Sequence, residues 1–149
     1  MDLLIRAAEN SESADPQELL AAIPYAQHLG VRADVAGQIL TLVMPFSQHL
    51  VGNVALPALH GGVIGSLLET AAIAQVVWEH RGLRLPKPVD IAIDFLRSGR
   101  PVDTLARAII TKRGRRVANV RAEAWQDDAA RPIAALHGHF LVTPTPASR

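Results

Sequence analysis

The sequence predicts an α+β fold in which an antiparallel β-sheet wraps around one long central helix. Three observations carry this prediction. The run from Gly62 to Trp78 is almost entirely apolar, four later segments have the length and alternation of strands, and the 149-residue chain with 49% hydrophobic residues suits one compact core. We therefore expect a single domain over residues 1–149, with loose ends at 1–14 and 144–149.

Charge and cysteine content narrow the class of function. The 15 Lys and Arg residues nearly balance the 14 Asp and Glu residues, so neither nucleic acid nor a membrane surface is an expected partner. The absence of cysteine excludes disulfides and a thiolate nucleophile, and it makes the cytoplasm the expected location. The N-terminus does not have the pattern of a signal peptide, and the 62–78 run is too short for a bilayer crossing.

The first third of the chain predicts one short helix and one hairpin. Asp15 is typical of a helix N-cap and Pro16 of the first helical position, so "DPQELLAAI" is expected to begin a helix. Residues 29–45 alternate around Gly37, which predicts a hairpin, and residues 46–57 are expected to form a loop that leads into the long helix.

The long helix and the strands after it complete the predicted fold. In the helix, Ile64, Leu68, Ala71 and Trp78 fall at helical spacing, and Gln75 is the polar exception. Four segments with strand-like alternation follow, separated by short turns, at residues 88–97, 103–114, 116–128 and 131–143.

The order of several motifs resembles one known family. An Asn precedes "LHGG", a helical carboxylate follows nine residues after the His, and the later strands contain "VDIAIDFLR" and "GRRVANVRAEAW". This order is similar to that of the hotdog-fold acyl-CoA thioesterases of the phenylacetate-pathway (PaaI) type, over residues 25–143. The resemblance implies a hotdog fold, hydrolysis of acyl-CoA to a free acid and CoA without a metal or separate cofactor, and a homodimer with shared active sites, arranged as a dimer of dimers.

Glu69 is the carboxylate inside the apolar helix. A charged carboxylate is costly to bury unless it is paired or neutralised, so its presence needs a reason. The resemblance implies that it is a general base or a nucleophile. The alternative is an ordinary residue on a water-facing polar stripe with Ser66 and Thr70. Glu69 is one methylene longer than the Asp that is more frequent in the family, so its carboxylate takes a different path.

The "HGG" motif supplies the other candidate half of a site. At a helix N-terminus, Gly61 and Gly62 would present backbone N–H groups with partial positive charge and allow a ligand to approach closely. The resemblance implies an oxyanion hole for a thioester carbonyl, with His60 beside it. The alternative is that the glycines only permit a tight turn or close packing, and that His60 bonds its own loop.

Two positions besides Glu69 depart from the family pattern. Asn53 would orient the water or the carboxylate, or else cap a turn, and it lies seven residues before His60 where six are common. Pro88 replaces the Ser or Thr that often assists from the facing strand, and proline has neither hydroxyl nor N–H. Thr70 and Ser66 are candidates to replace that hydroxyl, and we count Thr70 and Gly62 among the substrate-binding candidates.

The spacing of the two candidate halves has a consequence for assembly. Gly61 and Glu69 are eight residues apart, which is about 12 Å along a helix, too far for both to touch one thioester carbon. Two helices packed antiparallel across a two-fold axis would instead place Gly61 of one chain beside Glu69 of the other. This is the arrangement that the hotdog resemblance implies, so Asn53, His60 and Gly61 of one subunit would face the partner's Glu69.

Basic residues suggest where coenzyme A phosphates would bind. Lys112, Arg113, Arg115 and Arg116 surround one predicted turn, and arginine binds phosphate bidentately. A solvated hairpin turn is an equally good interpretation of this run. Arg97, at the end of "IDFLR", is a further candidate.

The last strand carries His137 and His139 on one face. With no Cys or acidic residue near them in sequence, a structural role is favoured over a metal site. Two functions stay open beside hydrolysis: a non-catalytic acyl-CoA-binding hotdog protein, and a hotdog dehydratase or hydratase.

Overall fold

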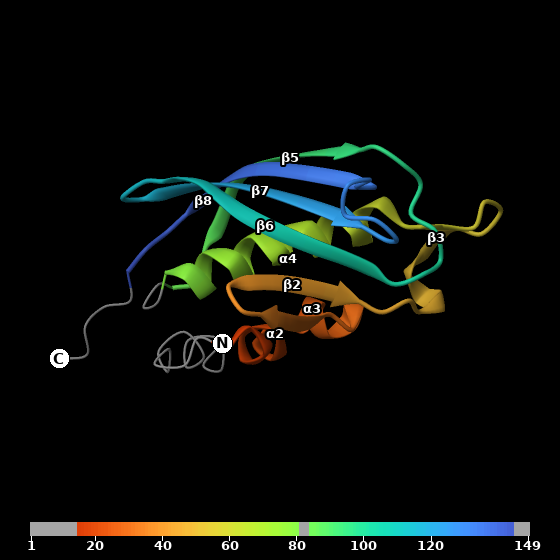
Figure 1. The fold of residues 1–149 in the computed structure, drawn as a ribbon, viewed down its shortest axis with the longest axis horizontal. Helices are drawn as coiled ribbons and strands as arrows, with labels where there is room; N and C mark the ends of the chain where they lie inside the picture. The colour runs from red at the N-terminus through yellow and green to blue at the C-terminus, as the bar shows by residue number, and fades with distance from the viewer. Residues whose placement is uncertain (1–14, 81–83, 145–149) are drawn as a thin grey trace.

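A computed structural model describes residues 15–80 and 84–144 of the chain. Its six-stranded antiparallel sheet curves around one long helix, α4 (Figure 1). The predicted α+β fold is therefore confirmed. The loose ends expected at 1–14 and 144–149 lie outside the described residues, except for Pro144. The strands, in their spatial order, are β1 (Arg32–Ala36), β2 (Ile39–Met44), β6 (Thr104–Arg113), β7 (Val117–Trp125), β8 (Ala134–Leu141) and β5 (Lys87–Phe95).

The chain enters the fold through two short helices, of which only the first was predicted. Helix α2 (Pro16–Ala22) begins as expected, because Asp15 accepts a hydrogen bond from the Gln17 N–H at 2.9 Å. Helix α3 (Pro24–Leu29) was missed. Its signals are Pro24 at the first helical position and Gly30, whose φ of 69° ends the helix in the left-handed region.

The predicted hairpin is confirmed, and the predicted loop after it is more ordered than expected. Strands β1 and β2 pair antiparallel around Gly37, whose φ is 62°. Within residues 46–57, where a loop was expected, the chain forms a 3₁₀ turn (Gln48–Leu50) and strand β3 (Val51–Asn53). Strand β3 pairs with β4 (Ala58–Leu59), and this small sheet leads into α4.

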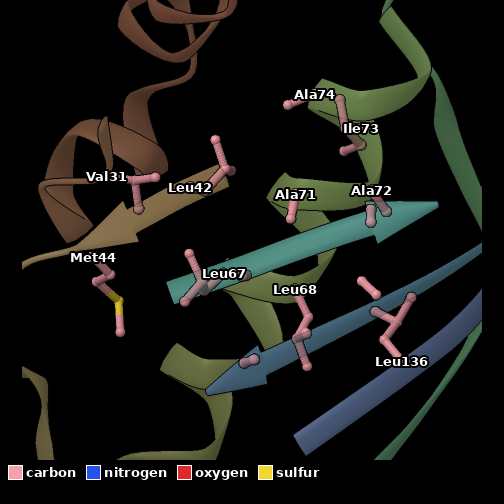
Figure 2. Packing of buried hydrophobic residues seen from close by; sticks show 14 of the residues in the cluster. Val31, Leu42, Met44, Leu67, Leu68, Ala71, Ala72, Ile73, Ala74 and Leu136 are labelled. Carbon is pink, nitrogen blue, oxygen red and sulfur yellow. The ribbon is translucent and has the colours of Figure 1, made fainter. Parts of the chain in front are cut away.

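Helix α4 (Gly61–Glu79) extends the predicted helix by one residue at each end. It is apolar on all sides because the sheet encloses it and α2 and α3 also contact it. Figure 2 shows Leu67, Leu68 and Ala72 of α4 packed among side chains of β2 and β8. By length and composition alone α4 could cross a membrane, but most of it is buried in this core.

The four predicted later strands are confirmed as β5 to β8. In β8, buried and exposed residues alternate, so one face covers α4 and the other faces outward. Strand β5 differs from the other three: it forms an edge of the sheet, and nearly all of its residues are exposed.

Candidate active site

His60 organises the start of α4. It is the N-cap residue, and its ring Nδ1 accepts a hydrogen bond from the Gly62 N–H at 2.9 Å. Its own backbone N–H donates to the Leu50 carbonyl at 2.9 Å, which ties the helix start to the segment before β3. Because Nδ1 is the acceptor, the neutral ring carries its proton on Nε2. His60 is exposed, so this N–H can donate to a ligand.

The two glycines after His60 have different roles. A Cβ on Gly62 would lie 3.0 Å from His60 Nδ1, so glycine makes room for the capping ring, and the Gly62 N–H is used by that cap. The Gly61 N–H has no acceptor within the described residues. A Cβ on Gly61 would lie 3.4 Å from the ring of Phe95. The packing interpretation therefore explains Gly62, whereas Gly61 presents a free N–H at the positive end of the helix dipole.

A pocket of about 370 Å³ opens beside Gly61. Gly61 and Arg97, which the sequence analysis considered separately, both line this pocket. Gly99 is buried at its floor, where a Cβ would lie 2.9 Å from Ile64 Cδ1. Sequence reasoning missed the rest of the lining, and no local signal in the sequence places these residues beside the helix start. The full lining is Ala58, Leu59, Gly61, Ile64, Phe95, Leu96, Arg97, Ser98 and Gly99.

Asn53 is exposed at the end of β3 and holds the turn after it. Its Oδ1 accepts hydrogen bonds from the backbone N–H groups of Ala55 at 3.0 Å and Leu56 at 3.2 Å. This is the turn-capping alternative. The side-chain NH₂ group is not part of these contacts and can still donate.

Glu69 lies two turns into α4 and is half-buried. No ion pair among the described residues includes it. Its polar neighbours on the helix are already engaged: Ser66 Oγ donates to the Gly62 carbonyl and Thr70 Oγ1 to the Ser66 carbonyl, both at 2.7 Å. Thr70 is also buried. Both hydroxyl protons are already used in hydrogen bonds within the helix, so neither hydroxyl can donate to a substrate in place of the hydroxyl that Pro88 lacks.

The turn between β6 and β7, which carries the basic residues among 112–116, lies at the other end of α4. Arg113 forms an ion pair with Glu79, and the other oxygen of Glu79 accepts from the buried Gln75. Arg115 and Arg116 are exposed between β6 and β7. Because α4 has 19 residues, these arginines lie roughly 27 Å along the helix from Gly61 of the same chain.

His137 and His139 are exposed on the outer face of the sheet, and β5 supplies the acidic partners that are absent from their sequence neighbourhood. His139 contacts Asp90, and His137 Nε2 lies 4.0 Å from Asp94. Within residues 15–80 and 84–144, no three His, Cys, Asp or Glu side chains are arranged to hold a metal ion.

Comparison with known proteins places this geometry in a family. The sequence profile described as "Thioesterase superfamily" matches residues 56–133, which include α4, the pocket and β5 to β7. Among curated relatives, a medium/long-chain acyl-CoA thioesterase of Escherichia coli is 28% identical over 120 residues, covering 71% of this chain and 77% of that protein. Its Salmonella typhimurium counterpart is 33% identical over 92 residues, or 53% of this chain and 59% of the relative, less than two thirds of its length.

Solved structures agree in fold. A protein from Chromobacterium violaceum is 38% identical with a TM-score of 0.71, covering 96% of this chain and 98% of that one. A phenylacetic acid degradation-related protein from Ralstonia eutropha is 19% identical with a TM-score of 0.70, covering 93% and 98%. The helix enclosed by an antiparallel sheet is thus the hotdog arrangement, and the chain belongs to the thioesterase superfamily.

Proposed function

We propose that the protein hydrolyses an acyl-coenzyme A thioester to the free acid and CoA. The observation that carries the proposal is the Gly61 N–H, which has no acceptor among the described residues and opens onto the Arg97-lined pocket. The same helix carries the half-buried Glu69, for which the described part of the chain offers no ion-pair partner. The relatives named as medium/long-chain acyl-CoA thioesterases support CoA thioesters as the substrate class. A cytoplasmic location, a single domain, a dimer of dimers and catalysis without metal or cofactor belong to the same proposal.

The proposed mechanism uses the two halves of the site in sequence. The thioester carbonyl oxygen accepts hydrogen bonds from the Gly61 N–H and the His60 Nε2–H. Glu69 of the partner subunit removes a proton from water, the resulting hydroxide bonds to the carbonyl carbon, and the negative charge moves to the carbonyl oxygen. The carbon–sulfur bond then breaks, and the CoA thiolate takes the proton held by Glu69. Direct attack by Glu69 through a mixed anhydride is the less favoured route.

The site requires a second copy of the chain, and the two sheet edges support this. At the β1 edge, Gln17 of α2 accepts a hydrogen bond from the Ala33 N–H at 2.8 Å, so a helix covers that edge. The β5 edge has no such cover among the described residues, and its exposed side chains include Val89 (65% exposed) and Phe95 (57%). An open edge with apolar side chains is suited to pairing with another strand.

The coenzyme A phosphates would bind at one of two places. Arg97 lies at the pocket of its own chain, whereas Arg115 and Arg116 lie far from it. If Gly61 faces the partner's Glu69, the partner's Glu79 end of α4 lies about 15 Å beyond Gly61. That separation suits the extended pantetheine arm of CoA, which favours Arg115 and Arg116 of the partner subunit for the phosphates. Release of free thiol from a panel of acyl-CoAs tests the activity and separates it from mere binding and from hydration chemistry.

The first prediction concerns the base. Glu69→Gln keeps the shape of the side chain but removes the proton acceptor, so kcat should fall by about 10²–10⁴-fold. Stopped thiol-release assays on several acyl-CoAs measure this. Gln17→Glu, a change of similar size outside the site, is the control. If Glu69→Gln folds normally and keeps near-normal turnover, Glu69 is an ordinary residue on the polar side of the helix and not the base.

The second prediction separates the two roles of His60. His60→Ala removes both the cap and the Nε2–H, and should lower stability by about 0.5–2 kcal/mol. His60→Ser keeps a good N-cap but has no imidazole, so stability should be nearly retained while kcat falls by about 10²-fold or more. Urea unfolding and thiol release are measured on both variants. A fully active His60→Ser variant would limit His60 to capping.

The third prediction concerns the nucleotide. Arg115→Gln with Arg116→Gln should raise KM for acyl-CoA about tenfold, equal to about 1.4 kcal/mol of binding, and leave kcat nearly unchanged. A short thioester without the nucleotide should show no change. Arg113→Gln is the matched control, because Arg113 is already paired with Glu79. Equal effects on both substrates would assign the arginines to structure.

The fourth prediction tests shared sites by subunit mixing. A chain with His60→Ala and Gly61→Pro lacks the carbonyl-binding half. Proline is tolerated at this first helical position, since His60 has φ −64° and ψ 130°. Mixed in equal amounts with Glu69→Gln chains, half of the dimers are heterodimers with one complete site, so activity should recover to roughly a quarter of wild type. Continued inactivity despite confirmed subunit exchange would place both halves in one chain.

A further inference from the structure

A serine and a histidine that the proposed hydrolysis does not use lie in contact on the segment between β2 and β3. The Oγ of Ser47 lies 2.8 Å from Nδ1 of His49, and the other ring nitrogen, Nε2, lies 3.1 Å from the backbone carbonyl oxygen of His28. A carbonyl oxygen can only accept, so Nε2 of the neutral ring carries the proton and Nδ1 has the lone pair. The Ser47 hydroxyl therefore donates its proton to the imidazole.

The Ser47 hydroxyl is not used in the way that its place in the chain predicts. Ser47 is the N-cap residue of the 3₁₀ turn that leads into β3, where a serine side chain usually accepts a hydrogen bond from the turn, but it makes no such bond here. The Ser47 backbone is fixed without that bond, because its carbonyl accepts from the Leu50 N–H at 3.0 Å. The preceding Phe46 N–H donates to the Asp103 carboxylate at 2.8 Å. The hydroxyl is thus held in place and directed at His49.

The imidazole of His49 is held by a different part of the chain. His28 lies in the last turn of α3, where backbone carbonyls lack a partner within the helix, and its carbonyl accepts from the His49 Nε2–H instead. The His28 ring meets the His49 ring edge to face, with 4.9 Å between the ring centroids, and stacks on Tyr25 at 5.6 Å. These contacts fix which ring nitrogen faces Ser47.

This arrangement has the three parts of an activated nucleophile: a hydroxyl, a base within hydrogen-bond reach, and a group that orients the base. When Nδ1 takes the proton of Ser47, the ring becomes positively charged, and the His28 carbonyl at the negative end of α3 stabilises that charge. In the Ser-His-Asp hydrolases a buried carboxylate has this role. A carbonyl carries less negative charge, so Ser47 is a weaker nucleophile than the serine of such an enzyme but a stronger one than an ordinary surface serine.

We propose that Ser47 is a second reactive site of the chain, which accepts an acyl group from an aryl ester with His49 as the base. Both side chains can be reached, since His49 is exposed and Ser47 is partly exposed. The Oγ of Ser47 bonds to the ester carbonyl carbon while its proton moves to His49 Nδ1. The bond between that carbon and the phenolic oxygen then breaks, and the phenolate takes the proton from the ring.

The product is an alkyl ester on Ser47, whose leaving group is poorer than the phenolate of the compound that formed it. Removal of the acyl group by water is therefore slower than its arrival, and the acyl-serine accumulates. The step uses neither the Gly61 N–H nor Glu69. The inference thus goes beyond the proposed function and does not rest on it.

Acetylation of the full chain by p-nitrophenyl acetate tests the proposal. Peptide mass spectrometry follows the acetylation of each serine over time, and Ser98 is the internal control because it is exposed and lies on a different loop. We expect Ser47 to be acetylated about 10²-fold faster than Ser98, which is the lower end of what a positioned base contributes. Equal rates at the two serines would overturn the proposal.

Two histidine variants test the assignment of the base. His49→Gln keeps a side chain that can accept the Ser47 hydrogen bond but cannot take the proton, so acetylation of Ser47 should fall about 10²-fold. His28→Gln is the matched control, because it removes a neighbouring exposed imidazole and keeps the backbone carbonyl, so most of the labelling should remain. Thermal unfolding checks the fold of each variant. Unchanged labelling in His49→Gln, or an equal loss in both variants, would overturn the assignment.

The Glu69→Gln chain separates this site from the proposed hydrolysis, and Ser47 should be labelled in it at the wild-type rate. Loss of Ser47 labelling in Glu69→Gln would show that the two sites are not independent and would overturn the inference. If Ser47 is labelled as expected but the wild-type protein releases no thiol from any acyl-CoA, the inference stands and the proposed function fails. If acyl-CoA is hydrolysed but Ser47 reacts no faster than Ser98, the proposed function stands and the inference is wrong.

Discussion

Helix α4 is apolar on all sides, and the requirement to shield it from water organises the rest of the fold. The curved sheet covers most of its length, and α2 and α3 contact it as well. Even its polar residues are engaged within the chain, since Gln75 donates to Glu79 at 2.6 Å and Ser66 and Thr70 bond helix carbonyls. Glu69 differs from these residues, because it is half-buried and has no ion-pair partner among the described residues. This difference supports its assignment as the proposed base.

A single imidazole decides which amide of the helix start is available. His60 Nδ1 takes the Gly62 N–H, and this bond both caps the helix and fixes the ring proton on Nε2. The consequence is that the Gly61 N–H and the His60 Nε2–H are left as the two donors on the exposed side. Capping and the proposed oxyanion binding would thus be aspects of one arrangement. The two glycines are not interchangeable: Gly62 accommodates the ring, and Gly61 leaves its amide accessible beside Phe95.

The sequence predicted those parts of the fold whose cause is local. Asp15 and Pro16 mark a helix start through their own conformational preferences, and the period of apolar residues marks α4 and the four later strands. Helix α3 was missed because its six residues are too few for a periodic pattern. The pocket residues Phe95 and Ser98, and the pairing of Arg113 with Glu79, were out of reach, because they depend on contacts between segments far apart in the chain.

The spacing of Gly61 and Glu69 makes the proposed site a property of the assembly. About 12 Å along a helix cannot be closed by a loop movement or a side-chain rotation, because the intervening two turns are held by backbone hydrogen bonds and by the core. If two copies pair through the open β5 edge, as the proposed shared site suggests, the register of the two β5 strands sets the geometry of the site. Moving the two-fold axis by one residue shifts one chain against the other by two residues, or about 6.6 Å, which is enough to carry Glu69 out of reach of the thioester. Strand pairing at the edge of the sheet would therefore control catalysis as directly as the catalytic side chains do.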